Sequence, residues 1–258
     1  MTAETLHQLT QRFLEYTDRY RLNGVLHPMH QLKLEHTVRV AADARAIAAA
    51  MHWPEEEIYL AEAIGLFHDI ARFPQYQQYQ SFSDHATVDH GDLGAQTVED
   101  EGILSDIASE PRSVILHAVK HHNKKSRPSD ASAHQDKHLR LIRDADRLDI
   151  FFVCWENIHS GQIHRHPEMV MNLDFYGPPS DTVIHQFERG EPLDYRCMTT
   201  MADRFILQLS WIHDLSFNET KRLVRNRCIL EKFIDVLPVR TDPLLRCFQK
   251  TANFLARA

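Results

Sequence analysis

The chain of 258 residues is 43% hydrophobic, which allows a sizeable core, and its formal charge of −7 at pH 7 disfavours nucleic-acid polymers and anionic membranes as partners. Its beginning lacks the pattern of a signal peptide, no apolar run approaches the roughly 20 residues of a membrane span, and its four cysteines form no Cys-x-x-Cys pair. We therefore expect a cytoplasmic protein with reduced thiols, either a monomer or a homo-oligomer.

Apolar residues recur at helical spacing through most of the chain, and the pattern predicts an all-α protein. We expect helices at about 3–21, 30–52, 55–71, 92–102, 107–124, 136–159, 194–215, 218–227, 229–236 and 242–257. Pro74 is expected to end its helix and to open a long polar loop that reaches His90 and could cover a cleft. Further loops are expected at 125–133 and 160–180.

The last of these loops indicates how the chain is organised. We expect a helical core over residues 1–160 and a C-terminal helical extension over residues 161–258 that packs on it, the two forming one continuous domain.

The most informative segment covers residues 63–72, an apolar stretch that abruptly carries His68 and Asp69. Burial of adjacent ionisable groups costs several kcal/mol unless a compensating charge is bound, and a divalent cation would supply it. A second pair, His213-Asp214, lies in a similarly apolar context, but no histidine follows it. Only the first pair has candidate partners on both sides, so we predict that it is half of a metal site.

Other candidate ligands come before and after this pair. His36 lies one helical turn from both Leu32 and Val40, so it is expected to face inward. As neighbours on one helix, His68 and Asp69 would diverge by about 100°. That geometry suits His68 as ligand of one ion and Asp69 as a carboxylate that bridges two.

Further histidines and acids follow. His117 and His121 share a helix face at i, i+4, while His122 turns aside. Acids interrupt an otherwise apolar helix at three positions, and at least one of them needs a cation: they are Asp144, Asp146 and Asp149. His90 stands at a plausible helix start, where an exposed position beside the cap is the alternative.

The ordered pattern His, His-Asp, His, His, Asp resembles the HD-domain superfamily of metal-dependent phosphohydrolases over about residues 26–155. The resemblance implies an HD-domain helical core and a primary metal held by His36, His68, Asp69 and Asp146. Asp146 is preferred to Asp144 because residues 145–148 are similar to the family's Ala-Asp-x-Leu segment.

The two-metal branch of the superfamily adds histidines after the central pair, and His90 with His121 or His122 fits that arrangement. Similarity of residues 118–123 to that branch favours His122, whereas the shared helix face favours His121. The nitrogen and oxygen ligands suit one or two divalent transition-metal ions, with Mn, Fe, Co, Ni and Zn not distinguished.

By this resemblance the protein would cleave a phosphomonoester or phosphodiester of a small phosphorylated molecule, a nucleotide included, with a metal-activated hydroxide. Asp69 would bridge or orient the hydroxide, and His85 is a candidate acid for the leaving group. The Gly-Tyr-Pro element of cyclic-dinucleotide phosphodiesterases is missing after His122, which argues against cyclic di-GMP.

Basic residues supply candidate phosphate contacts. Arg72 occupies the place of the basic residue in the family's His-Asp-Ile-Gly-Lys variant, and its planar fork of donors would bind phosphate. An ordinary helix-end cation is the alternative for Arg72. Lys120 and Lys124 belong to a dense basic cluster that could attract substrate, or that could simply be a solvated helix end.

Two other functions fit the same residues. The histidine-rich two-metal arrangement also occurs in di-iron oxygenases of the superfamily. A non-catalytic regulatory domain could likewise retain a structural metal site.

Overall fold

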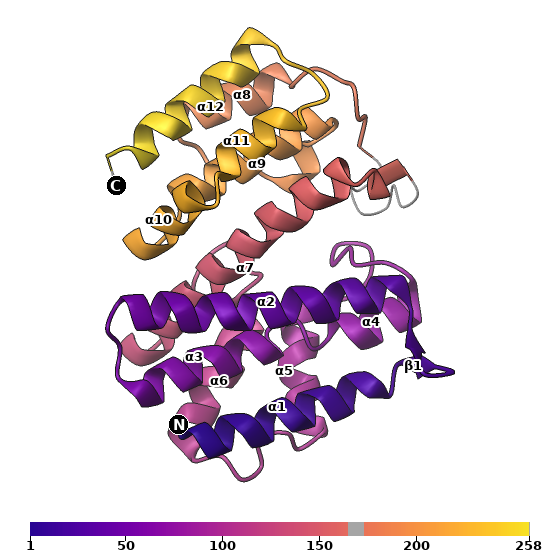
Figure 1. Ribbon diagram of the computed structural model, residues 1–258, viewed down its shortest axis with the longest axis vertical. Coiled ribbons are helices and arrows are strands. Elements are labelled where there is room, and N and C mark those ends of the chain that lie inside the picture. Colours follow the sequence, from indigo (N-terminus) through magenta and orange to yellow (C-terminus); the bar gives the residue numbers. More distant parts are fainter. Residues whose placement is uncertain (165–172, 258) are drawn as a thin grey trace. The chain divides into compact units, whose positions relative to one another are not determined.

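The computed structural model describes residues 1–164 and 173–257, and helices dominate both stretches (Figure 1). The chain divides into two compact units, Met1–Asp149 and Ile150–Ala258. The division falls inside helix α7 (Ala133–His159), about ten residues before the boundary expected from the sequence. None of the described helices combines the length and the apolarity needed to cross a bilayer.

Unit 1 begins with a long helix and a small hairpin that precede the helices of the site. Its elements are α1 (Ala3–Asp18), β1 (Arg21–Leu22), β2 (Val25–Leu26), α2 (Pro28–Ala50), α3 (Glu55–Phe67), α4 (Arg72–Tyr79), α5 (His90–Asp100), α6 (Ser109–His121) and the first part of α7. The predicted helices at 3–21, 30–52, 92–102, 107–124 and 136–159 are confirmed to within two to four residues at each end.

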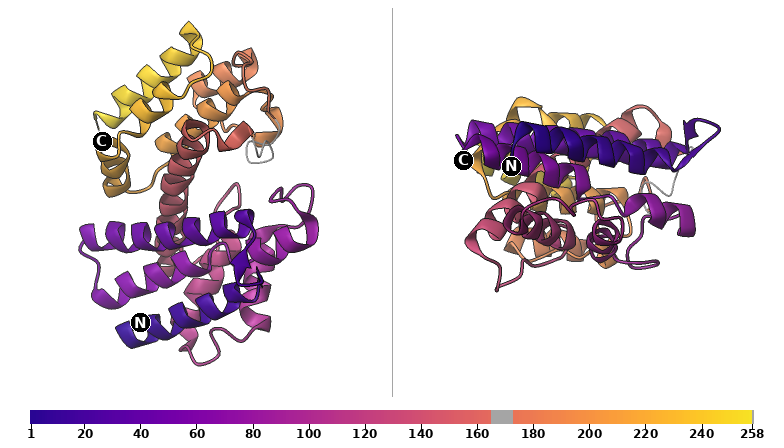
Figure 2. Two further views of the ribbon diagram at one scale, coloured as in Figure 1. Left: turned by 45° about the vertical axis from the view of Figure 1, so that its right-hand side comes forward. Right: turned by 90° about the horizontal axis from the view of Figure 1, so that it is seen from below.

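Close contact between α2 and α3 sets the frame of unit 1, and both views in Figure 2 show the purple helices packed together. The contact depends on Gly65, because a Cβ atom added there would lie 2.5 Å from Cα of Ala41. Phe67, at the end of α3, meets Phe13 of α1 edge to face, with ring centroids 6.1 Å apart. Both rings are fully buried, so the core lies between these helices.

The expected end of the helix at Pro74 is a wrong prediction. Helix α3 already ends at Phe67, residues 68–71 form a turn, and Pro74 lies in the first turn of a new helix, α4. A proline is tolerated there because the first amide groups of a helix have no partner within the helix. The polar loop therefore begins only after α4.

Unit 2 contains the rest of α7 and a set of shorter helices. They are η1 (Gln162–His164), α8 (Asp181–Arg189), η3 (Tyr195–Cys197), α9 (Met201–His213), α10 (Asn218–Asn226), α11 (Ile229–Asp235) and α12 (Asp242–Leu255). Phe205, Phe233 and Phe151 form its aromatic centre, with Phe205 and Phe233 centroids 5.1 Å apart. Residues 165–172 of the expected loop at 160–180 lie outside the described residues.

Two predictions for unit 2 need correction. Helix α8 was not predicted, and α9 begins at Met201 instead of residue 194. The later start has a local cause: the Thr200 hydroxyl accepts from the amide of Asp203, whose side chain accepts in return, and this capping box fixes the first turn.

Candidate metal centre

One group of ligand atoms gathers in unit 1 from three elements. His36 comes from α2, His68 from the turn after α3, and Asp146 from α7. His36 Nε2 lies 3.3 Å from His68 Nε2 and 3.2 Å from Asp146 Oδ1. Oδ2 of Asp69 lies 3.5 Å from the same His36 nitrogen. Four residues therefore direct nitrogen or oxygen atoms toward one small volume.

A second group shares Asp69 with the first. His90, the first residue of α5, and His122, just past the end of α6, bring their Nε2 atoms within 2.9 Å of each other. Oδ1 of Asp69 lies 3.3 Å from Nε2 of His90 and 3.7 Å from Nε2 of His122. Because the two oxygens of Asp69 face different groups, its carboxylate is placed to bridge two cations.

The outer ring nitrogens of two histidines are held by the backbone. Nδ1 of His68 donates to the carbonyl of Gly65 at 2.7 Å, and Nδ1 of His122 donates to the carbonyl of Val119 at 2.8 Å. A carbonyl oxygen can only accept, so the Nδ1 atoms carry the protons. In a neutral ring this leaves a lone pair on each Nε2, which is the form that binds metal.

Carboxylates hold the other two histidines. Nδ1 of His36 donates to Asp149 Oδ2 at 2.6 Å, and Arg39 donates to Oδ1 of the same carboxylate at 2.6 Å. Nδ1 of His90 donates to Asp84 Oδ2 at 2.5 Å. Such outer contacts fix the ring orientation of metal-ligating histidines and increase their basicity.

The electrostatics of the centre call for positive charge. Burial and Lys33 lower the pKa of His36, but its hydrogen bonds with Asp146, Asp149 and Asp69 outweigh them and raise that pKa to about 10. Burial also opposes ionisation of Asp69, yet its electrostatic interactions with Lys33, His68 and Arg72 hold its pKa well below the usual range. Four imidazoles around buried carboxylates therefore fit one or two divalent transition-metal ions.

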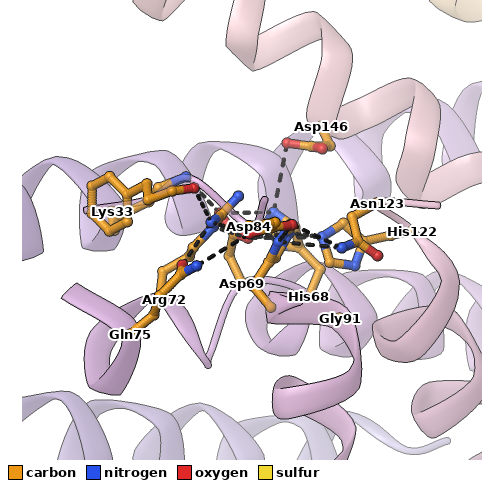
Figure 3. A network of polar contacts seen from close by, with 12 residues as sticks. Lys33, His68, Asp69, Arg72, Gln75, Asp84, Gly91, His122, Asn123 and Asp146 are labelled. Atoms are coloured by element: carbon orange, nitrogen blue, oxygen red, sulfur yellow. Dashed lines mark hydrogen bonds and ion pairs between the residues drawn. The ribbon is translucent and has the colours of Figure 1, made fainter. Parts of the chain in front are cut away.

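Lys33 is a residue of the centre that the sequence did not single out. Its ammonium donates to Oδ2 of Asp69 at 2.8 Å and lies over the ring of Phe82, 5.2 Å from the centroid (Figure 3). The side chain of Lys33 is 17% exposed, and that of Asp146 is 18% exposed. The centre is thus partly open to solvent where these two side chains lie.

Arg72 lies beside the centre, as expected, but its guanidinium has protein partners. Nη1 donates to Gln75 Oε1 at 2.7 Å, to the carbonyl of Phe82 at 2.8 Å and to Asp84 Oδ1 at 2.9 Å, while Nε lies 3.4 Å from Asp69 Oδ1. Arg72 therefore holds Asp84 in place (Figure 3), and Asp84 in turn accepts from Nδ1 of His90.

The structure does not gather every candidate. The rings of His121 and His117 pack at a tilt, with centroids 4.7 Å apart, and neither residue joins a ligand group. His122 takes the place that helix-face reasoning gave to His121. Asp144 is buried but belongs to neither group. His85 is exposed and belongs to neither group either.

The basic candidates beyond Arg72 lie apart from the ligands. Lys120 is exposed. Lys124 forms ion pairs with Asp89 at 2.7 Å and Asp92 at 2.8 Å, which tie the end of α6 to the start of α5. Its charge is therefore largely balanced within the protein.

The second His-Asp pair serves packing. His213 lies between the rings of Phe187 and Phe254 in unit 2, and its Nε2 is 3.1 Å from the hydroxyl of Thr251. Burial lowers its pKa.

A family comparison fits this geometry. The family model for the HD domain matches residues 34–150, which include both ligand groups. Residues 34–150 form an HD domain. HD domains belong to the HD superfamily of metal-dependent phosphohydrolases, so the resemblance seen in the sequence and the all-helical fold are both confirmed. No curated protein and no solved structure is significantly similar to the chain.

The match also covers the candidate ligands and most of the residues that hold them. All six residues of the two groups lie within the HD domain, whereas Lys33 lies one residue before it. The six are His36, His68, Asp69, His90, His122 and Asp146. The outer contacts from Asp84 and Asp149 also fall within the HD domain.

Proposed function

We propose that the protein is a phosphohydrolase with two metal ions, acting on a phosphomonoester or phosphodiester of a small molecule such as a nucleotide. The observation that carries this proposal is the position of Asp69, whose two oxygens face two separate sets of imidazoles at 3.3 to 3.8 Å. The HD domain supports metal-dependent hydrolysis as the class of reaction.

His36, His68, Asp69 and Asp146 would hold one ion, and Asp69, His90 and His122 the other. When bound, the ions would lower the pKa of a coordinated water toward neutrality and stabilise negative charge on phosphoryl oxygens. Asp149 and Asp84 would keep the Nδ1 protons of His36 and His90 in place, so that both rings present Nε2 inward.

Two cations favour a phosphorylated substrate. Lys33 and Arg72 both contact Asp69, and both side chains are partly exposed, at 17% and 13%. Once ions neutralise Asp69, the ammonium of Lys33 would be available to a phosphate, and the Arg72 guanidinium would add to the positive field. We leave His85, Lys120 and Lys124 out of the reacting set because of their exposure or their pairing with other acids.

A di-iron oxygenase is the second candidate, because four imidazoles and a bridging carboxylate also suit iron. The two cations beside Asp69 favour hydrolysis of an anion.

The free thiols of all four cysteines fit the cytoplasmic location that we propose.

The test is reconstitution of metal-free protein with Mn²⁺, Zn²⁺ or Fe²⁺ under anaerobic conditions, followed by a panel of nucleotides and phosphomonoesters. We expect phosphate release with at least one ion other than iron. Asp69→Asn should abolish turnover, and His213→Ala should not. Turnover that requires both iron and oxygen would instead establish an oxygenase. Bound metal without turnover of any compound would favour a regulatory domain.

A further inference from the structure

A third group of potential ligands lies in unit 1 and shares no residue with the centre described above. Glu57 stands in the first turn of α3, while His134 and His138 stand in the first two turns of α7. Oε2 of Glu57 lies 2.9 Å from Nε2 of His134 and 2.9 Å from Nε2 of His138. We propose that these three side chains form a separate site for one divalent transition-metal ion, with Zn²⁺ the best match.

The geometry of the pair on α7 favours this interpretation. His134 and His138 are four residues apart, so they lie on the same face of the helix, and their ring centroids are 5.0 Å apart. Zinc commonly takes two histidines and a glutamate, with a water in the fourth position. Zinc bonds of about 2.0–2.1 Å would place tetrahedral ligand atoms about 3.3 Å apart, so the observed contacts need to widen by only a few tenths of an ångström.

Surrounding residues support the ligands. Nδ1 of His134 contacts the carboxylate of Glu110 on α6, the kind of outer contact that orients a metal-bound imidazole. His138 is fully buried and packs its ring edge to face against Trp53, with centroids 5.2 Å apart. Its Nδ1 has no hydrogen-bond partner among the described residues, so Nε2 is the nitrogen that ties it to the group.

Among the described residues, Lys137 is the lysine that contacts this group. Its ammonium lies 3.1 Å from Oε2 of Glu57 and 3.7 Å from the centroid of the Trp53 ring. A carboxylate has about four lone-pair sites, so Glu57 can accept a hydrogen bond from Lys137 and ligate an ion at the same time. Two carboxylates, Glu57 and Glu110, against one ammonium leave a net negative charge that a divalent cation would offset.

The consequence would be structural. Glu57 lies eleven residues before His68 along the chain, and His134 lies twelve before Asp146. An ion held by Glu57 and His134 would join the start of α3 to the start of α7. Each of these two helices leads to residues of the proposed two-metal centre around Asp69, the dinuclear centre. Zinc at this site would therefore stabilise the frame that carries them.

Titration of the metal-free full chain with Zn²⁺ tests the proposal, with dialysis and elemental analysis counting the bound ions. His134→Ala and Glu57→Gln should each lose one equivalent and lose part of the rise in Tm that Zn²⁺ gives the wild type. The matched control is His121→Ala, since His117 and His121 have the same spacing but no third ligand among the described residues. That variant should bind as much zinc as the wild type.

Zinc bound at the dinuclear centre can be eliminated by mutation, so that only the third group is counted. In an Asp69→Asn background we expect one equivalent to remain, and to be lost when His134→Ala is added. Circular dichroism identifies variants that fold, and anomalous scattering at the zinc edge from wild-type crystals locates the ions if a variant does not. Zinc density between Glu57, His134 and His138 would support the site. Its absence there, or equal zinc content in wild type and His134→Ala, would overturn the proposal whatever the dinuclear centre does.

Discussion

Lys33 donates to Oδ2 of Asp69 at 2.8 Å, and this oxygen is the one that faces His36 and His68. In the metal-free protein the ammonium thus supplies positive charge at a carboxylate that a cation would otherwise neutralise. Removal of one member of a buried ion pair leaves the other uncompensated.

We predict that Lys33→Met destabilises the metal-free protein by about 3 kcal/mol, toward the lower end for buried pairs because Lys33 is partly exposed. Metal should restore most of that loss, since the ions replace the missing charge on Asp69. Thermal unfolding with and without Mn²⁺ or Zn²⁺ measures both quantities. If the variant loses the same stability in its metal-free and metal-loaded forms, the ammonium and the ions do not share this role.

The raised pKa of His36 predicts how stability depends on pH. A group whose pKa is about 10 when folded and about 6.5 when unfolded contributes stability that is fully present below 6.5 and is lost as the pH rises through 10. The urea concentration at which metal-free protein unfolds should therefore fall progressively as the pH rises from 6.5 to 10. A bound metal removes this proton, so metal-loaded protein should show a flatter profile. Parallel profiles would contradict this assignment, and His36→Ala should flatten the metal-free curve.

Substitution of Arg72 tests whether it acts by its positive charge or by holding Asp84 and His90 in place. Because Nη1 holds Asp84, and Asp84 holds Nδ1 of His90, Arg72→Ala should weaken the ion at His90 and His122 about 10-fold or more while leaving the other ion bound. The ratio kcat/KM for any substrate should fall as well. Metal affinity measured by competition with a chelator distinguishes the two ions. Loss of both ions together would mean that Arg72 supports the whole centre.

Asp84→Asn is the companion variant. It removes the anionic partner of His90 but leaves Arg72 in place, so it should weaken the same ion without the additional effect on substrate binding. A rise in KM as large as that of Arg72→Ala would show that Arg72 acts on substrate through Asp84.

Gly65→Ala should damage both packing and metal binding. The new Cβ would overlap the backbone of Ala41, which we expect to cost about 1–3 kcal/mol and to move α3, with His68, away from α2, which carries His36. Gly102→Ala is the control, because its φ of 62° strains a side chain while nothing lies within 4 Å of the added atom. Both variants should lower Tm, but only Gly65→Ala should weaken metal binding. Unfolding and metal titration of both variants decide the matter.

Much of the fold could be predicted because helical periodicity is local. The same reasoning missed the hairpin at residues 21–26, although Asn23-Gly24 is a recognised turn signal and both residues have positive φ. It also missed α4, because a proline after a helical pattern predicts a helix end, whereas Pro74 lies in the first turn of a new helix. Asn23-Gly24 is thus a hairpin signal that helical periodicity does not read. Pro74 shows that a proline can mark the start of a helix as well as its end.

The site could be predicted in part. The order of histidines and acids indicated most of the residues that the structure brings together, but helix-face reasoning favoured His121 on the assumption that α6 continues. In the structure α6 ends at His121, and His122 turns inward through its bond to Val119. Lys33 and Asp84 had no local signal, since each meets its partner only after the chain has folded.

Gly65 has two structural roles. Its carbonyl accepts from Nδ1 of His68 and so fixes the tautomer of that ring, and its lack of a side chain lets α2 pack closely against α3. The two atoms that an added Cβ would approach most closely are Cα of Ala41, at 2.5 Å, and its amide nitrogen, at 2.9 Å, and every amino acid has both. No replacement at position 41 can therefore make room. In a selection for revertants of Gly65→Ala, suppressors should arise elsewhere in the two helices or by reversion, and not at the residue that it touches.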